Sequence, residues 1–230
     1  QELIRAQFAN RMGPISNDIY REKLEYARLG LLMLEQEIAW FGNADYQLKG
    51  YLSEGTGIGK EPNQGQKLQD QTSPADMFSI LNTGVTKIAS TEGERPNTLG
   101  LGTRAFLAVN QKITGLNNDM TVGQAFIQGS PWIEEIVWIP QLGFRQDLFV
   151  ELAKTKTPAE AERLAGGIKK QDVMLTWHRD PSRSRLIVAQ DLVMTPPTIN
   201  DAQETTVAQF LYTGGLEIKR PRAHHILVNV

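Results

Sequence analysis

Apolar positions between residues 19 and 40 recur at three- and four-residue steps, which is the period of an α-helix. Ser16, Asn17 and Asp18 are residue types that start helices, and Gly42-Asn43 provides a stop. About twenty residues at roughly 1.5 Å each predict a rod of about 30 Å. Its expected apolar stripe consists of Leu24, Ala27, Leu31, Leu34, Ile38 and Phe41. A shorter helix is expected over residues 1–12, before Gly13-Pro14.

Capping signals predict several shorter helices along the rest of the chain. Ser73-Pro74-Ala75-Asp76 reads as an N-cap followed by a first-turn proline and an acid. Thr103 is expected to cap a helix that runs to about Val109, and Thr121 opens another. Thr157-Pro158-Ala159-Glu160 is a capping box, and Gly166-Gly167 supplies its C-terminal stop.

Strand patterns dominate the second half of the chain. Residues 96–101 and 133–140 each predict one strand, and apolar and polar positions alternate from Val173 to His178. Further strands are expected over 185–194 and 205–212, with a last strand pattern beyond a break at Gly214-Gly215. The segment 49–72 reads as an irregular surface loop with room for one short strand. Because helices and strands mix without regular βαβ alternation, the predicted fold class is α+β.

Composition narrows the function classes. The 230 residues are 40% hydrophobic and 22% charged, which is enough for a globular core in one domain or two closely joined subdomains. The net charge of -2 argues against a strongly basic nucleic-acid binder, so any contact with DNA would come from local patches. There is no cysteine, which removes disulfides and thiol chemistry. No apolar run approaches the ~20 residues of a membrane span. A chain that opens at Gln1 is expected to be a fragment or a processed product.

Two segments are similar to catalytic motifs but fail at required positions. His178-Arg179-Asp180 matches the start of a protein-kinase catalytic loop, but Arg185 stands where that motif needs asparagine. A strand end followed by a turn is therefore expected there. The run from Gly55 to Lys60 is similar to a phosphate-binding loop, but Glu54 and Glu61 replace the required glycine and hydroxyl residue. We expect an ordinary loop in that segment.

The remaining polar candidates also favour structural roles. His224 and His225 are adjacent in a strand pattern, so they point to opposite faces and cannot easily chelate one metal ion. The paired acids Glu134-Glu135 and Glu35/Glu37 read as solvated charge. The four tryptophans, at 40, 132, 138 and 177, are expected in the core. The sequence thus predicts no catalytic residue, no cofactor, no metal site and no enzyme.

Two segments carry a resemblance to a known family. The run from Glu35 to Tyr46 and the run from Tyr212 to Leu227, with the elements between them in order, resemble the major capsid proteins of tailed phages and prophages. The resemblance covers nearly the whole chain. It implies the Hong Kong 97-type capsid fold, with a spine helix, an elongated P subdomain and a compact A subdomain.

The resemblance also implies a layout and contact sites. The P-like subdomain would comprise about 1–60 and 182–212, and the A-like subdomain about 72–179 and 216–230. One loop would sit near the centre of a capsomer, and another would meet neighbours around three-fold positions. The implied subunit contacts are Asn117, Asn118, Asp119, Pro196, Pro197, Asn200 and Asp201. The N-terminal arm and the long E-loop hairpin of the family have no counterpart before the helix.

The function that this resemblance implies is that of a major capsid subunit assembling as pentamers and hexamers into an icosahedral shell around a DNA genome. Its expected partners are copies of itself, a scaffold, a maturation protease and packaged DNA at close range, with no membrane. Assembly would take place in the cytoplasm of a bacterial host, and the protein would reside in the virion. An encapsulin-type compartment shell is a close alternative. A hydrolase or nucleotide-binding enzyme is the alternative from another class, and it would need a pocket with convergent polar groups.

Overall fold

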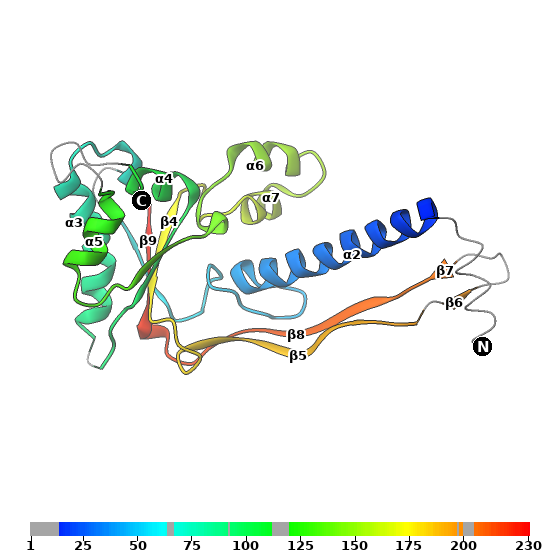
Figure 1. Cartoon of the computed structure of the whole chain (residues 1–230). Helices are drawn as coiled ribbons and strands as arrows, with labels where there is room; N and C mark the ends of the chain where they lie inside the picture. Colours follow the sequence, from blue (N-terminus) through cyan, green and yellow to red (C-terminus); the bar gives the residue numbers. More distant parts are fainter. Residues whose placement is uncertain (1–13, 64–66, 92, 112–119, 197, 200–204) are drawn as a thin grey trace.

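The computed structural model describes residues 14–63, 67–91, 93–111, 120–196, 198–199 and 205–230. A body built on a five-stranded sheet carries a long arm, made of one helix and a β-hairpin that extend from the sheet in the same direction (Figure 1). The α-helices are α2 (Pro14–Phe41), α3 (Pro74–Ala89), α4 (Thr103–Val109), α5 (Val122–Gly129), α6 (Gln146–Leu152) and α7 (Pro158–Leu164). The 3-10 turns are η1 (Leu68–Asp70), η2 (Pro140–Leu142) and η3 (Pro221–Ala223).

The strands form three sheets of unequal size. The body sheet contains β1 (Gly59–Pro62), β2 (Thr98–Leu101), β3 (Glu135–Trp138), β4 (Val173–Trp177) and β9 (His224–Val228). The arm contains β5 (Ser184–Met194) paired with β8 (Gln209–Ile218), and β6 (Thr198–Ile199) paired with β7 (Thr205–Thr206). The strand order of the body sheet is β1-β9-β4-β2-β3, and β4 runs antiparallel to both of its neighbours. The mixed helices and strands confirm the α+β class.

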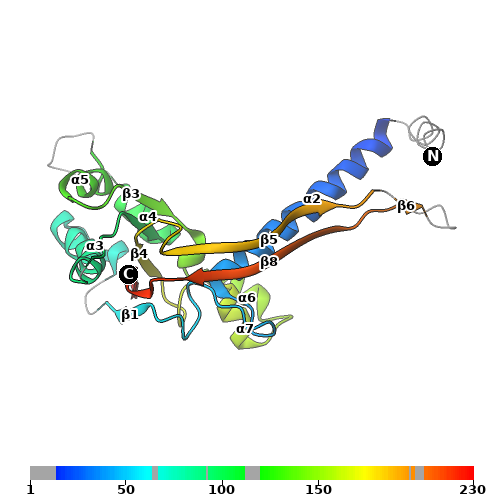
Figure 2. The same cartoon turned by 90° about the horizontal axis from the view of Figure 1, so that it is seen from below.

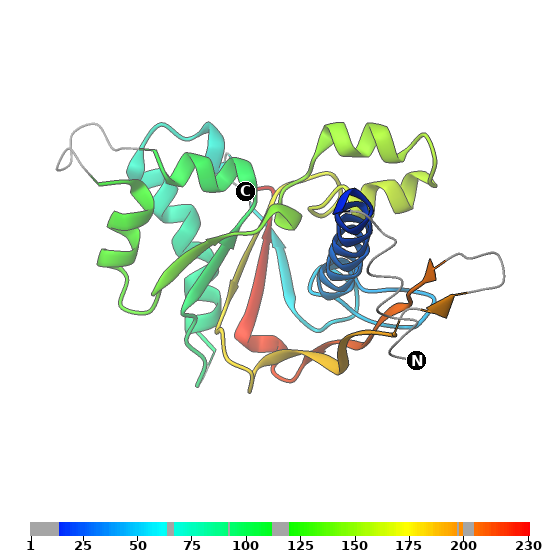
Figure 3. The same ribbon diagram turned by 45° about the vertical axis from the view of Figure 1, so that its right-hand side comes forward.

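The body sheet is buried on both faces, and a separate apolar core lies on each. Alternate residues of β4 enter the two cores, Met174 on one face and Leu175 on the other. Helices α3, α4 and α5 cover the first face, whereas the C-terminal end of α2 and the loop after it lie on the second (Figure 3). All five residues of β4 are buried, because a central strand covered on both sides meets no solvent.

The arm is held together along its length. Strands β5 and β8 pair antiparallel, and α2 lies along the hairpin (Figure 2). The Nε2 amide of Gln209 donates to the carbonyl of Leu24 at 3.1 Å, which ties β8 to the helix. Leu24, Leu31, Ile38 and Phe41 are the partly or fully buried positions of the predicted stripe, whereas Ala27 is exposed and Leu34 is 47% exposed. The predicted rod is confirmed, although it begins at Pro14 rather than at residue 19, because proline is well suited to a first helical position.

Two of the predicted caps are confirmed. The Thr121 hydroxyl accepts from the Gln124 amide at 3.2 Å, and the Gln124 side chain returns a bond to the Thr121 amide at 3.0 Å. The Thr157 hydroxyl accepts from the Glu160 amide at 3.3 Å, which confirms the cap, but the Glu160 carboxylate accepts from Lys156, so the predicted capping box is only half formed. The prediction for Thr103 was wrong: Gly102 is the N-cap of α4 and Thr103 is its first residue. The Thr103 hydroxyl instead accepts from the indole of Trp138 at 3.1 Å.

The expected break at Gly214-Gly215 does not exist. β8 runs unbroken from Gln209 to Ile218, and Ile187 pairs with Gly215 while Val188 pairs with Thr213. The unmatched glycine makes a β-bulge, and Gly215 adopts a φ of +78°, which glycine tolerates at little cost. The two glycines therefore bend a long strand instead of ending it.

The tryptophans do not share one environment. Trp177 is buried in the core on the second face of the sheet, and Trp40 packs against that core. Trp132 and Trp138 are 38% and 53% exposed, so placing all four in the core was wrong. Trp138 ends β3, which is an edge strand of the body sheet among the described residues.

Candidate functional site

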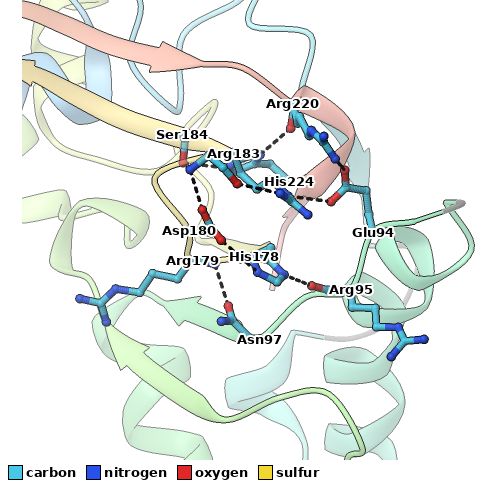
Figure 4. Close-up of polar contacts among 11 residues, drawn as sticks. Glu94, Arg95, Asn97, His178, Arg179, Asp180, Arg183, Ser184, Arg220 and His224 are labelled. Atoms are coloured by element: carbon cyan, nitrogen blue, oxygen red, sulfur yellow. Dashed lines mark hydrogen bonds and ion pairs between the residues drawn. The ribbon is translucent and has the colours of Figure 1, made fainter.

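Three segments meet where the hairpin leaves the body sheet, and we call this region the hairpin foot (Figure 4). It comprises residues 93–97, 178–185 and 217–224. The amide of Lys219 donates to the carbonyl of Arg183 at 2.8 Å, which joins the two ends of the hairpin. The His178 amide donates to the Ala223 carbonyl at 3.2 Å, which joins the hairpin to the turn before β9. The foot is thus fixed by main-chain bonds.

Glu94 is the buried acid of the hairpin foot, at 7% exposure. Its two carboxylate oxygens accept from Arg183 Nε at 3.1 Å and from Arg220 Nη1 at 3.2 Å. One arginine comes from each side of the hairpin, so a single carboxylate clamps both strands to the turn after α3. A buried carboxylate needs such partners, because desolvating an unpaired charge is costly.

Other acids of this region are also engaged. Glu217 accepts from Arg185 Nε at 2.7 Å, and Lys219 Nζ lies 3.9 Å from the same carboxylate. Glu135 accepts from Arg179 Nη1 at 2.8 Å, and the hydrogen bond from this guanidinium lowers the pKa of the Glu135 carboxyl. Acids used in this way are ion-pair partners and are not poised as general bases.

A hydrogen-bonded chain of side chains lies behind the ion pairs. The Ser184 hydroxyl lies 2.7 Å from the Tyr51 hydroxyl and 3.0 Å from His224 Nε2, while His224 Nδ1 lies 3.0 Å from the carbonyl of Arg220. A carbonyl can only accept, so Nδ1 carries the proton and Nε2 accepts from Ser184. Burial lowers the pKa of His224, which keeps the ring neutral as this arrangement requires.

The Ser184–His224 contact has the spacing of a nucleophile and its base, but its third member is a backbone carbonyl in place of a carboxylate. The histidine is 2% exposed, and the Ser184 hydroxyl is also bonded to Tyr51. These hydrogen-bonded side chains therefore orient the foot of the hairpin, and they offer no charged partner that would orient a histidine base.

The kinase-like segment is a strand end and a turn, as predicted. β4 ends at Trp177, and the Asp180 carboxylate accepts from the Ser182 amide at 2.6 Å. Hydrogen bonds from Ser182 lower the pKa of the Asp180 carboxyl, so this acid shapes the turn.

The phosphate-loop-like segment likewise leads into strand β1 and not into a helix. The Lys60 ammonium donates to the carbonyls of Leu52 and Ser53 at 3.0 and 2.8 Å. Its donors are thus directed at the protein backbone, which confirms the ordinary-loop prediction for the residues before β1.

The two adjacent histidines point to opposite faces of β9, as predicted. His224 faces the hairpin foot, whereas His225 pairs in register with Thr176 and is 6% exposed. Burial lowers the pKa of His225, and the nearby Glu61 raises it and Lys87 lowers it further. Within the described ranges, no group of three or more histidines and acids is placed to hold a metal ion.

A groove of about 630 Å³ lies beside β1 and α3 and includes Glu61, Asp76 and Lys87 in its lining. Lys87 Nζ lies 2.7 Å from the Glu61 carboxylate, and the hydrogen bond from Lys87 lowers the pKa of Glu61. Paired in this way, the two groups neutralise each other rather than forming an acid–base couple.

Of the predicted subunit contacts, only Pro196 falls within the described residues, and it is exposed just after β5. The other six lie outside the described part of the chain: Asn117, Asn118, Asp119, Pro197, Asn200 and Asp201.

A surface that sequence reasoning missed lies on α2. Tyr26, Leu29 and Met33 are spaced as one helical stripe, on the side opposite to Leu24 and Leu31. They are 66%, 47% and 67% exposed. A helix that is apolar on two sides is normally covered on both. The signal was available in the run Leu29-Gly30-Leu31-Leu32-Met33-Leu34, which is apolar all round.

The ion pairs of the hairpin foot were missed as well. The signal there was the density of arginine in 178–185 and 219–222. Nothing in the sequence pointed to Glu94 as their partner, since that acid lies 89 positions before Arg183.

No protein-family model and no curated protein matches the sequence. Solved structures do match. The capsid of Myoviridae Phage XM1 superposes with a TM-score of 0.68 at 11% identity, over 100% of this chain and 69% of that one. A phage-related protein from Bordetella bronchiseptica RB50 superposes with a TM-score of 0.55 at 15% identity, over 95% of this chain and 68% of that one. A virus-like particle from Pyrococcus furiosus superposes with a TM-score of 0.48 at 12% identity, over 74% of this chain and 56% of that one.

The chain has a phage capsid fold. The first superposition spans every element of the molecule, body and arm alike, so the expected fold is confirmed. Within this capsid fold, α2 is the expected long spine helix. The described part of the molecule has no helix of the length and apolarity that crossing a membrane requires.

Proposed function

We propose that this chain is the major capsid subunit of a tailed bacteriophage or prophage, which assembles as pentamers and hexamers into an icosahedral shell around DNA. The observation that carries the proposal is the superposition of the whole chain on a phage capsid at a TM-score of 0.68. Because identity is 11%, the fold is shared and the function is inferred from it.

The shape of the molecule suits a lattice. In this proposal, about 1–60 and 182–212 form the P-like subdomain, and about 72–179 and 216–230 form the A-like subdomain. A stiff arm and a compact body present different surfaces to different neighbours, and unlike surfaces that meet head to tail generate closed rings. The clamp of Glu94 on both sides of the hairpin supports this role, since it keeps the arm at a fixed angle to the body.

The second apolar stripe of α2 supports contact with another copy of this chain. Tyr26, Leu29 and Met33 leave an apolar face exposed in the single molecule, and a shell would give that face a neighbour. The predicted contact loops around Asn118 and Pro196 belong to the same proposal, as do a scaffold and a maturation protease. Assembly would occur in the host cytoplasm, and the mature location would be the virion.

The test is electron microscopy of this chain, produced alone and with its neighbouring gene products, together with intact mass and nuclease protection of any enclosed DNA. Closed shells that protect DNA when the neighbouring gene products are present would support the proposal. Shells that enclose a protein cargo and no nucleic acid would favour the encapsulin-type alternative. A protein that stays monomeric with those neighbouring gene products present would refute both.

A further inference from the structure

We propose that the hairpin foot binds the phosphate backbone of double-stranded DNA without reading its sequence. The inference goes beyond a shell-forming role, and it rests on the proposed function only in choosing DNA as the polyanion to test.

Basic residues are concentrated at the hairpin foot. Residues 93–97, 178–185 and 217–224 hold seven of the chain's 24 lysines and arginines but only three of its 26 acids. The seven are Arg95, Arg179, Arg183, Arg185, Lys219, Arg220 and Arg222. The foot therefore carries a formal charge of +4 in a chain whose net charge is -2. Main-chain bonds join 178–185 to 217–224, and the side chains of Glu94 and Asn97 tie 93–97 to them, which brings this charge to one corner of the fold.

The acids of the foot cannot neutralise this charge, because two of them are shared. Glu94 serves both Arg183 and Arg220, and Glu217 serves both Arg185 and Lys219. Each shared carboxylate leaves one positive charge uncompensated. Even with Glu135, which lies outside the three segments and pairs with Arg179, the surplus remains positive.

The uncompensated positive charge of the foot is also accessible to solvent. Arg95 and Arg222 are exposed, and neither forms an ion pair with any residue that the structure describes. The side chains of Arg179 and Arg220 are 65% and 56% exposed, although each holds a carboxylate with one nitrogen. A guanidinium has five donors, so these two arginines retain donors for a second anion.

The chemistry of the foot favours phosphate over a protein partner. Arginine forks match the geometry of phosphate oxygens, and contacts with a polyanion need no apolar centre. Protein interfaces, by contrast, are usually centred on buried apolar and aromatic side chains. The exposed residues of the foot are charged or polar, apart from Gly93 and Pro181. Duplex DNA is a dense polyanion that a fixed cluster of arginines can follow.

The experiment is fluorescence anisotropy of a labelled 20-base-pair duplex with this chain, in a salt titration from low ionic strength. The test variant is Arg95→Gln/Arg222→Gln, which removes two charges that hold no described ion pair. The matched control is Lys23→Gln/Arg104→Gln, which removes two exposed charges that also lack a described ion pair, on α2 and α4. Thermal unfolding of both variants checks that the fold is retained.

We expect salt-dependent binding that the test variant weakens by about tenfold at low salt, with a salt slope reduced by about 2. The control variant should stay within about twofold of the parent. Equal losses in both variants would overturn the proposal, since they would reflect net charge alone. Absence of binding at low salt would also overturn it, as would polyglutamate displacing the DNA at equal charge, which would assign the foot to an acidic protein. The assay needs no assembled shell, so its failure is distinguishable from failure of the capsid proposal.

Discussion

Arg183 Nε donates to the carboxylate of Glu94 at 3.1 Å, and this buried pair joins the start of the hairpin to the turn that follows α3. Replacing Glu94 with alanine would leave Arg183, whose side chain is 19% exposed, without its partner. We expect the free energy of unfolding to fall by about 2–4 kcal/mol, because an ion left unpaired in a buried site is strongly unfavourable. Urea denaturation measures the change.

The control for this pair is Lys154→Ala, which breaks an exposed contact with Glu151 on α6. Exposed pairs contribute little, so the expected loss is below about 1 kcal/mol. An equal loss in the two variants would show that burial of the Glu94 pair has no energetic consequence.

Two helical glycines are expected to respond in opposite ways to alanine. In α3, a methyl group at Gly84 would collide with the Thr176 hydroxyl and lie 3.0 Å from Met174 Cε, so Gly84→Ala should destabilise the protein by about 1–3 kcal/mol. In α2, nothing lies within 4 Å of the corresponding position at Gly30. There the gain in helix propensity should stabilise the protein by up to about 1 kcal/mol. Thermal unfolding of both variants tests the pair, and a stabilising Gly84→Ala would contradict the close packing of α3 on β4.

Stability is expected to decrease as the pH falls below about 6.5. Burial lowers the pKa of both His224 and His225 from the ordinary value of 6.5, so the folded state binds fewer protons than the unfolded state in the range below that value. The contribution of each neutral ring is present above the unfolded pKa and is lost as the pH drops toward the folded one. Urea denaturation at a series of pH values between 7.5 and 5.5 measures the slope.

His225→Leu should flatten this dependence. No nitrogen of the His225 ring has a hydrogen-bond partner among the described residues, so leucine removes a titrating group without breaking a described bond. Stability at pH 7.5 should be unchanged or higher, since a buried polar group without partners is unfavourable. A slope equal to that of the parent would mean that His225 does not titrate differently on unfolding.

The exposed stripe of α2 offers a test that separates assembly from folding. Leu29→Lys/Met33→Lys should leave the unfolding transition within about 0.5 kcal/mol, because both side chains are exposed in the single molecule. The same variant, made in the full-length product, should reduce the yield of shells in negative-stain micrographs. Leu31→Ala, on the buried stripe of the same helix, should lower stability instead, by about 1–3 kcal/mol for a half-buried site. Normal shell yield from the double variant would remove this stripe from the neighbour contacts.

The sequence predicted the elements with strong local signals. The period of α2, the helix starts at Thr121 and Thr157, and the turn at Asp180 each arise from residues close together in the chain. Its resemblance to phage capsid proteins also gave the right fold. Features that depend on residues far apart in the sequence were harder to predict, because no local pattern encodes them. Glu94 finds its arginines only after the chain has folded, and Trp138 is exposed because β3 is an edge strand.

The misread break at Gly214-Gly215 has the same origin. Glycine pairs end many strands, and only the partner strand reveals that here one of them is an extra residue in a bulge. The Thr103 error is similar, since its hydroxyl bonds to an indole from β3 and does not cap its own helix. Local propensity is a weak guide wherever a tertiary partner competes for the same polar group.

The position of β9 between β1 and β4 has a consequence for how this protein is made. Strand β9 follows all the other described strands, yet it pairs with β1 on one side and β4 on the other. While a ribosome is still synthesising residues 224–228, the strand position between β1 and β4 is unfilled. The backbone groups of β1 and β4 that face this position then lack their hydrogen-bond partners. Such long-range pairing is slow to form and exposes strand edges in the meantime. The body sheet therefore stays open until residues 224–228 have been made, and it can close only after the strands that precede them in the chain already exist.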